Sequence, residues 1–178
     1  STCPKPSTAS SAPAMRNPTQ HVDVGILDGK QKTALLHELA VWWSIDDLVR
    51  STATALMRGM RFEDHVGRLE RIDRFCRALP YFNEAVEMFQ PVPQTLMEGG
   101  DCDDHVLTKC ALAWALRYPF YVEPAGPLDE PYHYTCQLGF PPSDHPWGDE
   151  NTTWLPSEST ITGWFGEHFK DTLRRWGR

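Results

Sequence analysis

The stretch Gly99-Gly100-Asp101-Cys102-Asp103-Asp104-His105-Val106-Leu107 leads from two glycines into an apolar segment that continues to Leu116. Two glycines followed by acidic residues predict a tight turn, and the apolar run predicts a buried helix. Cys102 would stand in the first turn of that helix, where unpaired N–H groups and the helix dipole favour negative charge. Such a position lowers the pKa of a thiol. Asp103 and Asp104 suit a helix N-terminus, although their charge opposes a lowered thiol pKa.

Two polar residues downstream of Cys102 suggest a thiol active site. His133 lies in an extended segment, and Glu158 follows Trp154-Leu155-Pro156-Ser157. Acyl transfer by a thiol needs a base for the proton and a group that orients the base. Cys102 would be the nucleophile, and His133 the base and then the general acid. Glu158 would hold the imidazole ring through its second nitrogen.

The third member of this triad and the oxyanion donors have alternatives. Asp144 and Asp149, in the loop before the last strand, compete with Glu158 for the orienting role. The oxyanion would be stabilised by backbone N–H groups at the start of the helix. Those donors belong to Cys102 and Asp103, and the side chains of Gln90 and Gln94 are further candidates.

Metal sites are the weaker interpretation of the same region. Zinc-ligand types occur without a paired C-x-x-C, so structural zinc is poorly supported. Clustered aspartates favour calcium, but no EF-hand loop follows them. We expect no metal and no other cofactor. The residues in question are Cys102, His105, Cys110 and Cys136 for zinc, and Asp101, Asp103 and Asp104 for calcium.

Length and composition restrict the class of protein. The chain has 178 residues, 40% of them hydrophobic, so one domain with a substantial core is expected. A net charge of −7 argues against nucleic acid as the main partner, because phosphate binding needs a basic surface. We expect neither a membrane span nor a signal peptide. Five cysteines, an odd number, argue against a complete disulfide framework and favour a reducing compartment.

Apolar periodicity predicts an α+β fold, in which a helical N-terminal half and the cysteine-bearing helix pack on a small antiparallel sheet. A Ser/Pro-rich arm is expected at 1–20, a helical region at 21–80 and the core at 81–178. Ser44-Ile45-Asp46-Asp47 could restart the first helix after a kink. The expected helices are 30–60, 62–79, 102–117 and 164–176, and the strands are 120–122, 132–140 and 152–155. Irregular chain is expected at 81–101, 124–131 and 141–153.

Several chemically active side chains also have structural interpretations. Four arginines at three-residue spacing on the second helix indicate a solvated face or, less often, a docking surface for an acidic partner. Three cysteines fall on apolar periodic positions and are expected in the core. The remaining histidines have no evident partners in the pattern. These sets are Arg68, Arg71, Arg74 and Arg77; Cys76, Cys110 and Cys136; and His21, His37, His65, His145 and His168.

The motifs resemble those of the transglutaminase-like cysteine hydrolase superfamily, which has a papain-like fold, and most of all its compact form encoded by tailed phages. The likeness covers about residues 70–166 and is most specific at the G-D-C-D-D-H element. The family's aspartate is a glutamate here, and the connection before the last strand is longer and rich in proline. The matching segments are 93–96 (P-Q-T-L), 100–105 (G-D-C-D-D-H), 119–122 (P-F-Y-V), His133, 154–158 (W-L-P-S-E) and 162–164 (T-G-W).

This resemblance implies acyl transfer through a thioester, with water or an amine as acceptor and a protein or peptide as substrate. It also implies a phage origin, with the protein in the virion or in the host cytoplasm. The arm at 1–20 would contact other virion proteins. A structural virion protein that keeps the fold with little or no catalysis is the alternative, because fold does not fix function.

Overall fold

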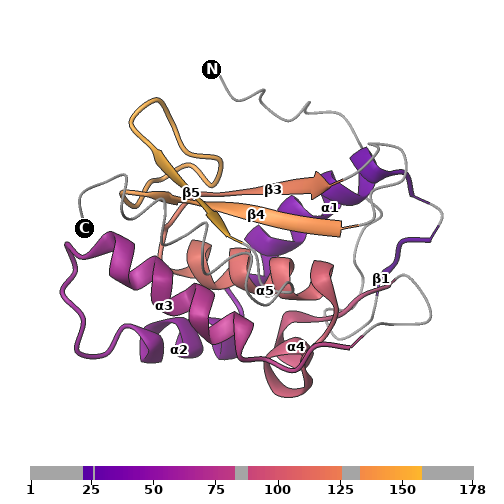
Figure 1. Ribbon diagram of the computed structural model, residues 1–178, viewed down its shortest axis with the longest axis horizontal. Coiled ribbons are helices and arrows are strands. Elements are labelled where there is room, and N and C mark those ends of the chain that lie inside the picture. Colours follow the sequence, from indigo (N-terminus) through magenta and orange to yellow (C-terminus); the bar gives the residue numbers. More distant parts are fainter. Residues whose placement is uncertain (1–21, 26, 83–87, 126–132, 158–178) are drawn as a thin grey trace.

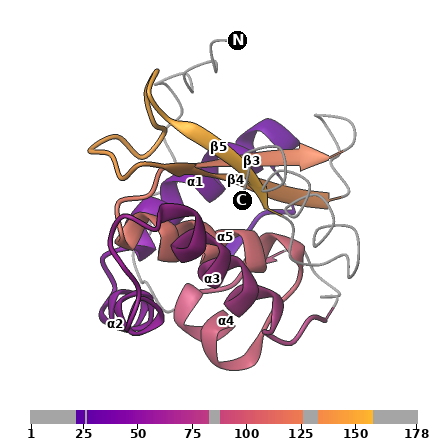
Figure 2. The same ribbon diagram turned by 60° about the vertical axis from the view of Figure 1, so that its left-hand side comes forward.

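The computed structural model describes residues 22–25, 27–82, 88–125 and 133–157. Figures 1 and 2 show the three-stranded sheet as one layer, with α5 beneath it and α2 and α4 on the far side of α5. Helices beside one small antiparallel sheet confirm the α+β class. In chain order the elements are β1 (Val22–Asp23), α1 (Gly29–Trp43), α2 (Asp47–Leu56), α3 (His65–Arg77), β2 (Met88–Phe89), α4 (Val92–Glu98), α5 (Cys102–Ala115), β3 (Phe120–Ala125), β4 (His133–Phe140) and β5 (Thr153–Ser157).

The main sheet has the order β3-β4-β5 with both pairs antiparallel, and β1 and β2 form a separate antiparallel pair. Along β4, buried and half-buried residues alternate from His133 to Leu138, as expected when one face covers a helix. β3 continues through Pro124 to Ala125, so the turn predicted at 124–131 starts too early. The loop between β4 and β5 is as long as predicted, because Phe140 pairs with Thr153.

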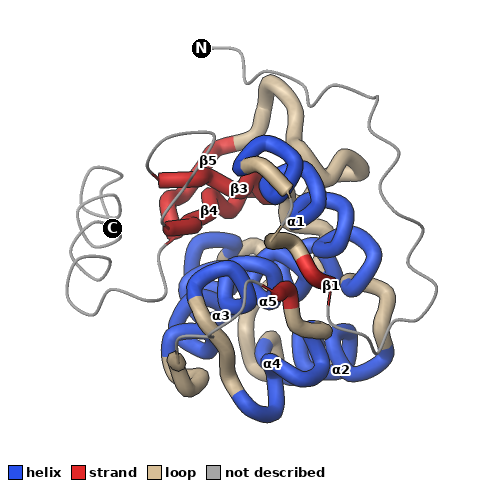
Figure 3. Tube along the Cα trace, turned by 90° about the vertical axis from the view of Figure 1, so that its right-hand side faces the viewer, coloured by secondary structure: helices blue, strands red, loops and turns tan. Residues whose placement is uncertain are grey.

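Helix α5 is the centre of the molecule, and Figure 3 shows α1 beside the sheet while the other helices lie below it. All residues of α5 from Asp103 to Trp114 are buried, which explains why the segment is apolar on every side. The helix starts at Cys102 because Asp101 caps it: the Asp101 side chain accepts from the N–H of Asp104, and the Asp104 side chain accepts from the N–H of Asp101.

The helix predicted at 30–60 is two helices, as the restart near residue 44 suggests. Ser44 ends α1, and its hydroxyl donates to the carbonyl of Val41 at 2.6 Å. The N-cap of α2 is Asp46, whose side chain accepts from the N–H groups of Leu48 and Val49 at 2.9 and 3.2 Å. The break is therefore where the sequence places it, but the capping residue is the aspartate.

The prediction of irregular chain at 81–101 is wrong in part, because β2 and α4 lie there. Pro93 falls in the first turn of α4, where a proline has the helical φ and where its missing N–H costs nothing. Pro91, just before the helix, is its N-cap. The two prolines start this short helix, although in the sequence they resemble helix breakers.

The arginine stripe on α3 is not a uniformly solvated face. Arg68 is 8% exposed, and its guanidinium lies over the rings of Phe62 and Tyr118. Arg71 donates to the carbonyls of Leu56 and Arg58 at 3.0 and 3.1 Å. The last two members form ion pairs on α3, Arg74 with Glu70 at 2.6 Å and Arg77 with Asp73 at 3.1 Å. These contacts within the chain explain the stripe without an acidic partner.

The predicted core cysteines are confirmed, since Cys76, Cys110 and Cys136 are fully buried. Among the described residues, no helix is long and apolar enough to cross a membrane. Several predictions lie outside the described residues: the arm at 1–20, the helix at 164–176, the G-W element, His21, His168 and Glu158.

Candidate functional site

The turn before Cys102 is built on contacts that only glycine allows. Gly99 has a φ of 88°, and a Cβ on it would collide with the carbonyl of Pro80. The N–H of Gly100 donates to that same carbonyl at 3.1 Å, and the carbonyl of Gly100 accepts from the N–H of Phe82 at 3.2 Å. Segment 80–82 therefore runs beside the turn and fixes the direction in which the chain enters α5.

A buried carboxylate holds the same turn from the other side. Asp104 is fully buried, and its two oxygens accept from the backbone N–H and the side-chain amide of Gln90 at 2.8 and 2.9 Å. The same Gln90 amide also donates to the carbonyl of Gly99 at 2.9 Å. The amide nitrogen of Gln90 carries two hydrogens, and these two contacts use both of them. Gln90 thus holds the turn together, which makes it a weaker oxyanion donor than the backbone N–H groups.

Cys102 is the first residue of α5 and is half-buried. Its sulfur accepts hydrogen bonds from two backbone N–H groups, those of Asp103 on α5 and Tyr134 on β4. The first donor belongs to the first turn of α5, where the helix itself offers its N–H groups no backbone carbonyl. The second shows that the start of β4 lies directly against the thiol. Helix and strand therefore both direct N–H dipoles at the same sulfur atom.

The expected lowering of the thiol pKa is wrong for this structure. Burial raises the pKa of Cys102 to about 12, with further contributions from the carboxylates of Asp103 and Asp101. The N–H groups of Tyr134 and Asp103 act in the opposite direction, but they do not outweigh burial and charge. At neutral pH the group is therefore a thiol, and any chemistry at the sulfur must begin by removing its proton.

His133 is the first residue of β4 and the chain neighbour of the residue that contacts the sulfur. Its side chain is half-buried, and the alternation along β4 places it on the face opposite Tyr134 and Cys136. The structure thus brings Cys102 to the end of the strand where His133 lies. Because His133 is the first residue of β4, its backbone lies at the same strand end as the thiol, and its side chain leaves the strand on the other face.

Of the three candidates for the third member of the triad, the structure describes Asp144 and Asp149. β5 runs antiparallel to β4, so its last described residue, Ser157, pairs with Cys136 near the His133 end. Glu158 follows Ser157 in the chain but lies outside the described residues. Asp144 and Asp149 follow the far end of β4, which at about 3.4 Å per residue is about 24 Å from His133. This separation counts against both as the group that orients His133.

The three aspartates at the turn are the one metal-like group among the described residues. Oxygens of Asp101, Asp103 and Asp104 lie within 4.8 Å of one another. Two of the three side chains have structural roles, because Asp101 caps α5 and Asp104 accepts hydrogen bonds from Gln90. The zinc-ligand types considered above, Cys102, His105, Cys110 and Cys136, form no such group within the described ranges.

Three other histidines are structural. The Nδ1 of His37 donates to the carbonyl of Thr33 at 2.9 Å, and its Nε2 accepts from the N–H of Val122 at 3.1 Å. This tautomer is neutral, and burial lowers the pKa of His37 to about 4. His65 contacts the Tyr118 hydroxyl at 3.0 Å, and His105 contacts the Pro80 carbonyl at 3.1 Å. Burial lowers the pKa of both groups.

Sequence reasoning missed two parts of this region. One is the N–H of Tyr134, for which no side-chain pattern exists. The other is a buried polar network formed by Asp73, Lys109 and Ser157. Its sequence signal is Lys109, the one charged residue between Val106 and Leu116.

A comparison of the chain with protein-family models, with curated proteins and with solved structures finds no match.

Proposed function

We propose that this protein is a transglutaminase-like thiol hydrolase or acyltransferase that acts on peptide or amide bonds through a thioester at Cys102. One observation carries the proposal: the sulfur of Cys102 accepts a hydrogen bond from the N–H of Tyr134, the residue next to His133. Thiol acyl transfer needs a base within hydrogen-bond reach of the sulfur. The Tyr134 contact supports the proposal because it brings the strand that carries His133 to the thiol.

In the proposed reaction, His133 takes the proton of the Cys102 thiol while the sulfur attacks the carbonyl carbon of the substrate. The new S–C bond gives a tetrahedral oxyanion, which N–H groups at the start of α5 stabilise. The C–N bond then breaks, and the imidazolium returns its proton to the leaving amine. Water or a second amine, deprotonated by His133, attacks the thioester and releases the thiol.

The raised pKa of Cys102 determines the step of the reaction at which the thiol loses its proton. Since burial and the two carboxylates keep the sulfur protonated at rest, the thiolate forms only as the sulfur attacks. This requires a base within reach at that moment, and His133 at the start of β4 is the candidate. Glu158, which follows the end of β5, would hold the imidazole ring in the tautomer that accepts the proton.

The test uses p-nitrophenyl acetate, a small activated ester that needs no binding pocket of its own. Wild-type protein should release p-nitrophenol and gain one acetyl group on Cys102, located by mass spectrometry. Cys102→Ala should abolish this acetylation, and His133→Ala should slow it by at least about a hundredfold near neutral pH. His145→Ala is the matched control, because His145 is an exposed loop histidine. Equal rates for the His133 and His145 variants would remove His133 from the mechanism.

A structural virion protein that retains the fold is the second candidate, and the pKa of about 12 at Cys102 favours it. A thiol that is rarely ionised and flanked by carboxylates suits a site that has lost catalysis. In this case the arm at 1–20 would bind other virion proteins, and the protein would reside in the particle. Wild-type protein that is not acetylated on Cys102, together with loss of particle assembly when residues 1–20 are deleted, would favour this candidate.

A further inference from the structure

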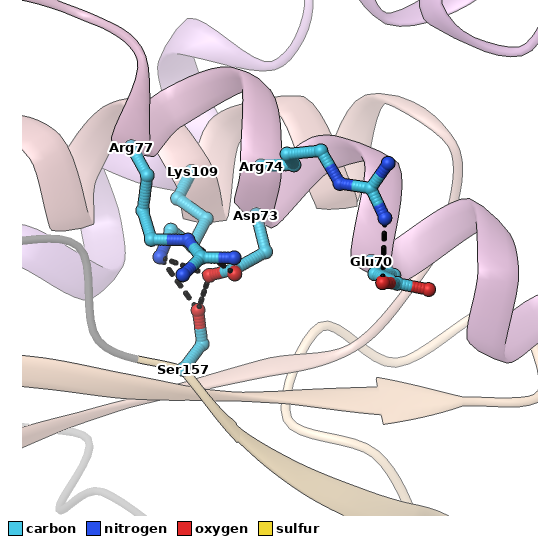
Figure 4. A network of polar contacts seen from close by, with 6 residues as sticks. All are labelled: Glu70, Asp73, Arg74, Arg77, Lys109 and Ser157. Atoms are coloured by element: carbon cyan, nitrogen blue, oxygen red, sulfur yellow. Dashed lines mark hydrogen bonds and ion pairs between the residues drawn. The ribbon is translucent and has the colours of Figure 1, made fainter. Parts of the chain in front are cut away.

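A closed polar network lies in the core, two helical turns from the thiol site (Figure 4). The ammonium of Lys109 donates to Asp73 Oδ1 at 2.7 Å and to Ser157 Oγ at 2.6 Å. The hydroxyl of Ser157 donates in turn to the same Asp73 oxygen at 2.7 Å. Arg77 pairs with the other oxygen of Asp73 at 3.1 Å. We call Asp73, Lys109 and Ser157 the clamp.

The clamp joins three elements, of which α5 also carries Cys102. Asp73 lies on α3, Lys109 on α5, and Ser157 is the last described residue of β5. Lys109 follows Cys102 by seven residues, which is close to two full turns, so both side chains leave α5 on the same side. Ser157 pairs with Cys136 on β4, two residues after Tyr134. The contact between Lys109 and Ser157 thus sets how the start of β4 lies on the start of α5.

All three residues of the clamp are buried, so the charged groups lose their hydration and must keep their hydrogen bonds to one another. Lys109 is 0% exposed, Asp73 1% and Ser157 3%. Burial by itself would lower the pKa of Lys109, but Asp73 and the sulfurs of Cys136 and Cys76 more than offset it and the pKa is raised. The ammonium is thus charged in the core. Apolar residues of similar volume often stabilise a core as well as a buried ion pair does. What the ion pair adds is a fixed geometry, because its hydrogen bonds hold only one register.

We propose that Asp73, Lys109 and Ser157 are positioning residues that hold the backbone N–H of Tyr134 on the sulfur of Cys102. They touch neither the sulfur nor a substrate, and they act through β5 and β4. The catalytic consequence, a faster transfer of an acyl group to Cys102, rests on the proposed function. The geometric claim concerns the Tyr134 N–H alone, and it can be measured without any reaction.

The central experiment compares two substitutions in β5. Ser157→Ala removes the hydroxyl and leaves the ion pair of Lys109 with Asp73 in place, so the variant should fold. Leu155→Val is the matched control, because Leu155 is buried in the same strand and pairs with Leu138, outside the clamp. Ser157→Thr restores a hydroxyl. Hydrogen exchange of the Tyr134 amide is measured by nuclear magnetic resonance, and acetylation of Cys102 by p-nitrophenyl acetate is measured across the pH range.

Ser157→Ala should speed exchange at the Tyr134 amide by about tenfold relative to neighbouring β4 amides, and slow acetylation of Cys102 by about tenfold. Leu155→Val should lose as much stability or more, yet it should leave Tyr134 exchange relative to the neighbouring β4 amides and the rate of Cys102 acetylation unchanged. Ser157→Thr should restore both the exchange rate and the acetylation rate. Unchanged Tyr134 exchange in Ser157→Ala overturns the proposal, as does an equal effect of Leu155→Val. Wild-type protein that is not acetylated overturns the proposed function instead, and the exchange result still decides the geometric claim.

Discussion

Two positions on one face of α5, Cys102 and Lys109, have different surroundings. We call them the Cys102 end and the Lys109 end of the two turns that separate them. At the first turn, Cys102 is half-buried and contacts backbone N–H groups, with carboxylates beside it. Two turns later, Lys109 is fully buried and contacts a charged side chain and a hydroxyl. At Cys102 a reactive sulfur has only weak hydrogen bonds. At Lys109 a buried charge has strong partners, and removing one of them should lower the free energy of unfolding.

The difference suggests that the two positions have separate roles, with the chemistry at Cys102 and the fixed packing of the elements at Lys109. Hydrogen bonds to a sulfur are weak, so the Cys102 end contributes little to stability and its electrostatics can vary. A buried ammonium without its carboxylate is expensive, so the Lys109 end fixes the register of α3, α5 and β5. Substitutions at the Lys109 end should therefore cost more stability than substitutions at the Cys102 end.

The largest effect is expected from Asp73→Ala, which leaves the ammonium of Lys109 buried without its counterion. The free energy of unfolding should fall by about 3–5 kcal/mol, measured by urea denaturation near pH 7. Replacing both partners, Asp73→Leu with Lys109→Met, should cost less than Asp73→Ala alone. The control is Glu70→Ala on the same helix (Figure 4), because the pair of Glu70 with Arg74 is solvent-exposed and should contribute less than about 1 kcal/mol. Equal losses for Asp73→Ala and Glu70→Ala would contradict the assignment of a rigid end.

His37 allows a buried charged group to be compared with a buried neutral one, because it is buried and hydrogen-bonded like Lys109 but carries no charge. Its pKa is about 4 in the folded protein and 6.5 in the unfolded chain. Because the folded pKa is lowered, the stabilisation is complete above pH 6.5 and is lost as the pH falls from 6.5 to 4. The loss should reach about 3 kcal/mol.

His37→Gln tests this dependence, because the glutamine can still accept from Val122 but does not titrate in this range. Denaturation between pH 7 and pH 4.5 should show a smaller loss of stability for His37→Gln than for wild type. His145→Gln, at an exposed position, should keep the wild-type dependence. A wild-type dependence in His37→Gln would mean that carboxylates alone cause the acid sensitivity.

Gln90→Ala probes the loop that supports the thiol end. It removes the side-chain donor to the buried oxygen of Asp104, and a buried acceptor without its partner costs about 1–3 kcal/mol. Gln94→Ala is the control, since the Gln94 amide donates to Glu98 at 3.0 Å on the surface of α4 and should contribute a few tenths of a kcal/mol. Similar urea midpoints for the two variants would show that the Gln90 contact is not part of the support of the turn.

The sequence predicts well what depends on neighbours in the chain. The start of α5 at Cys102 follows from two glycines, a capping aspartate and an apolar run, and all of them lie within one short stretch. The break near Ser44 and the strands β3 and β4 are also local patterns. The sequence does not predict α4, which starts at Val92, because a proline in the first turn of a helix looks the same in the sequence as a proline in a loop.

What the sequence does not predict depends on residues far apart in the chain. The contacts of Lys109 with Asp73 and with Ser157 span 36 and 48 residues, and only the fold brings these residues together. The pKa of Cys102 has the same origin. Its local pattern favours a thiolate, but β4 covers the helix end, and the burial that results raises the pKa instead.

The smallest effect is expected at the thiol end, from Asp103→Asn. After burial, the carboxylate of Asp103 is the strongest cause of the raised pKa of Cys102, so its neutralisation should lower that pKa. Alkylation of Cys102 by iodoacetamide at pH 8 should then speed up by less than about tenfold, with almost no change in stability. Asp47→Asn is the matched control, because Asp47 occupies the first turn of α2. If Asp103→Asn leaves the alkylation rate unchanged, burial alone sets the thiol pKa, and the Cys102 end is as fixed as the Lys109 end.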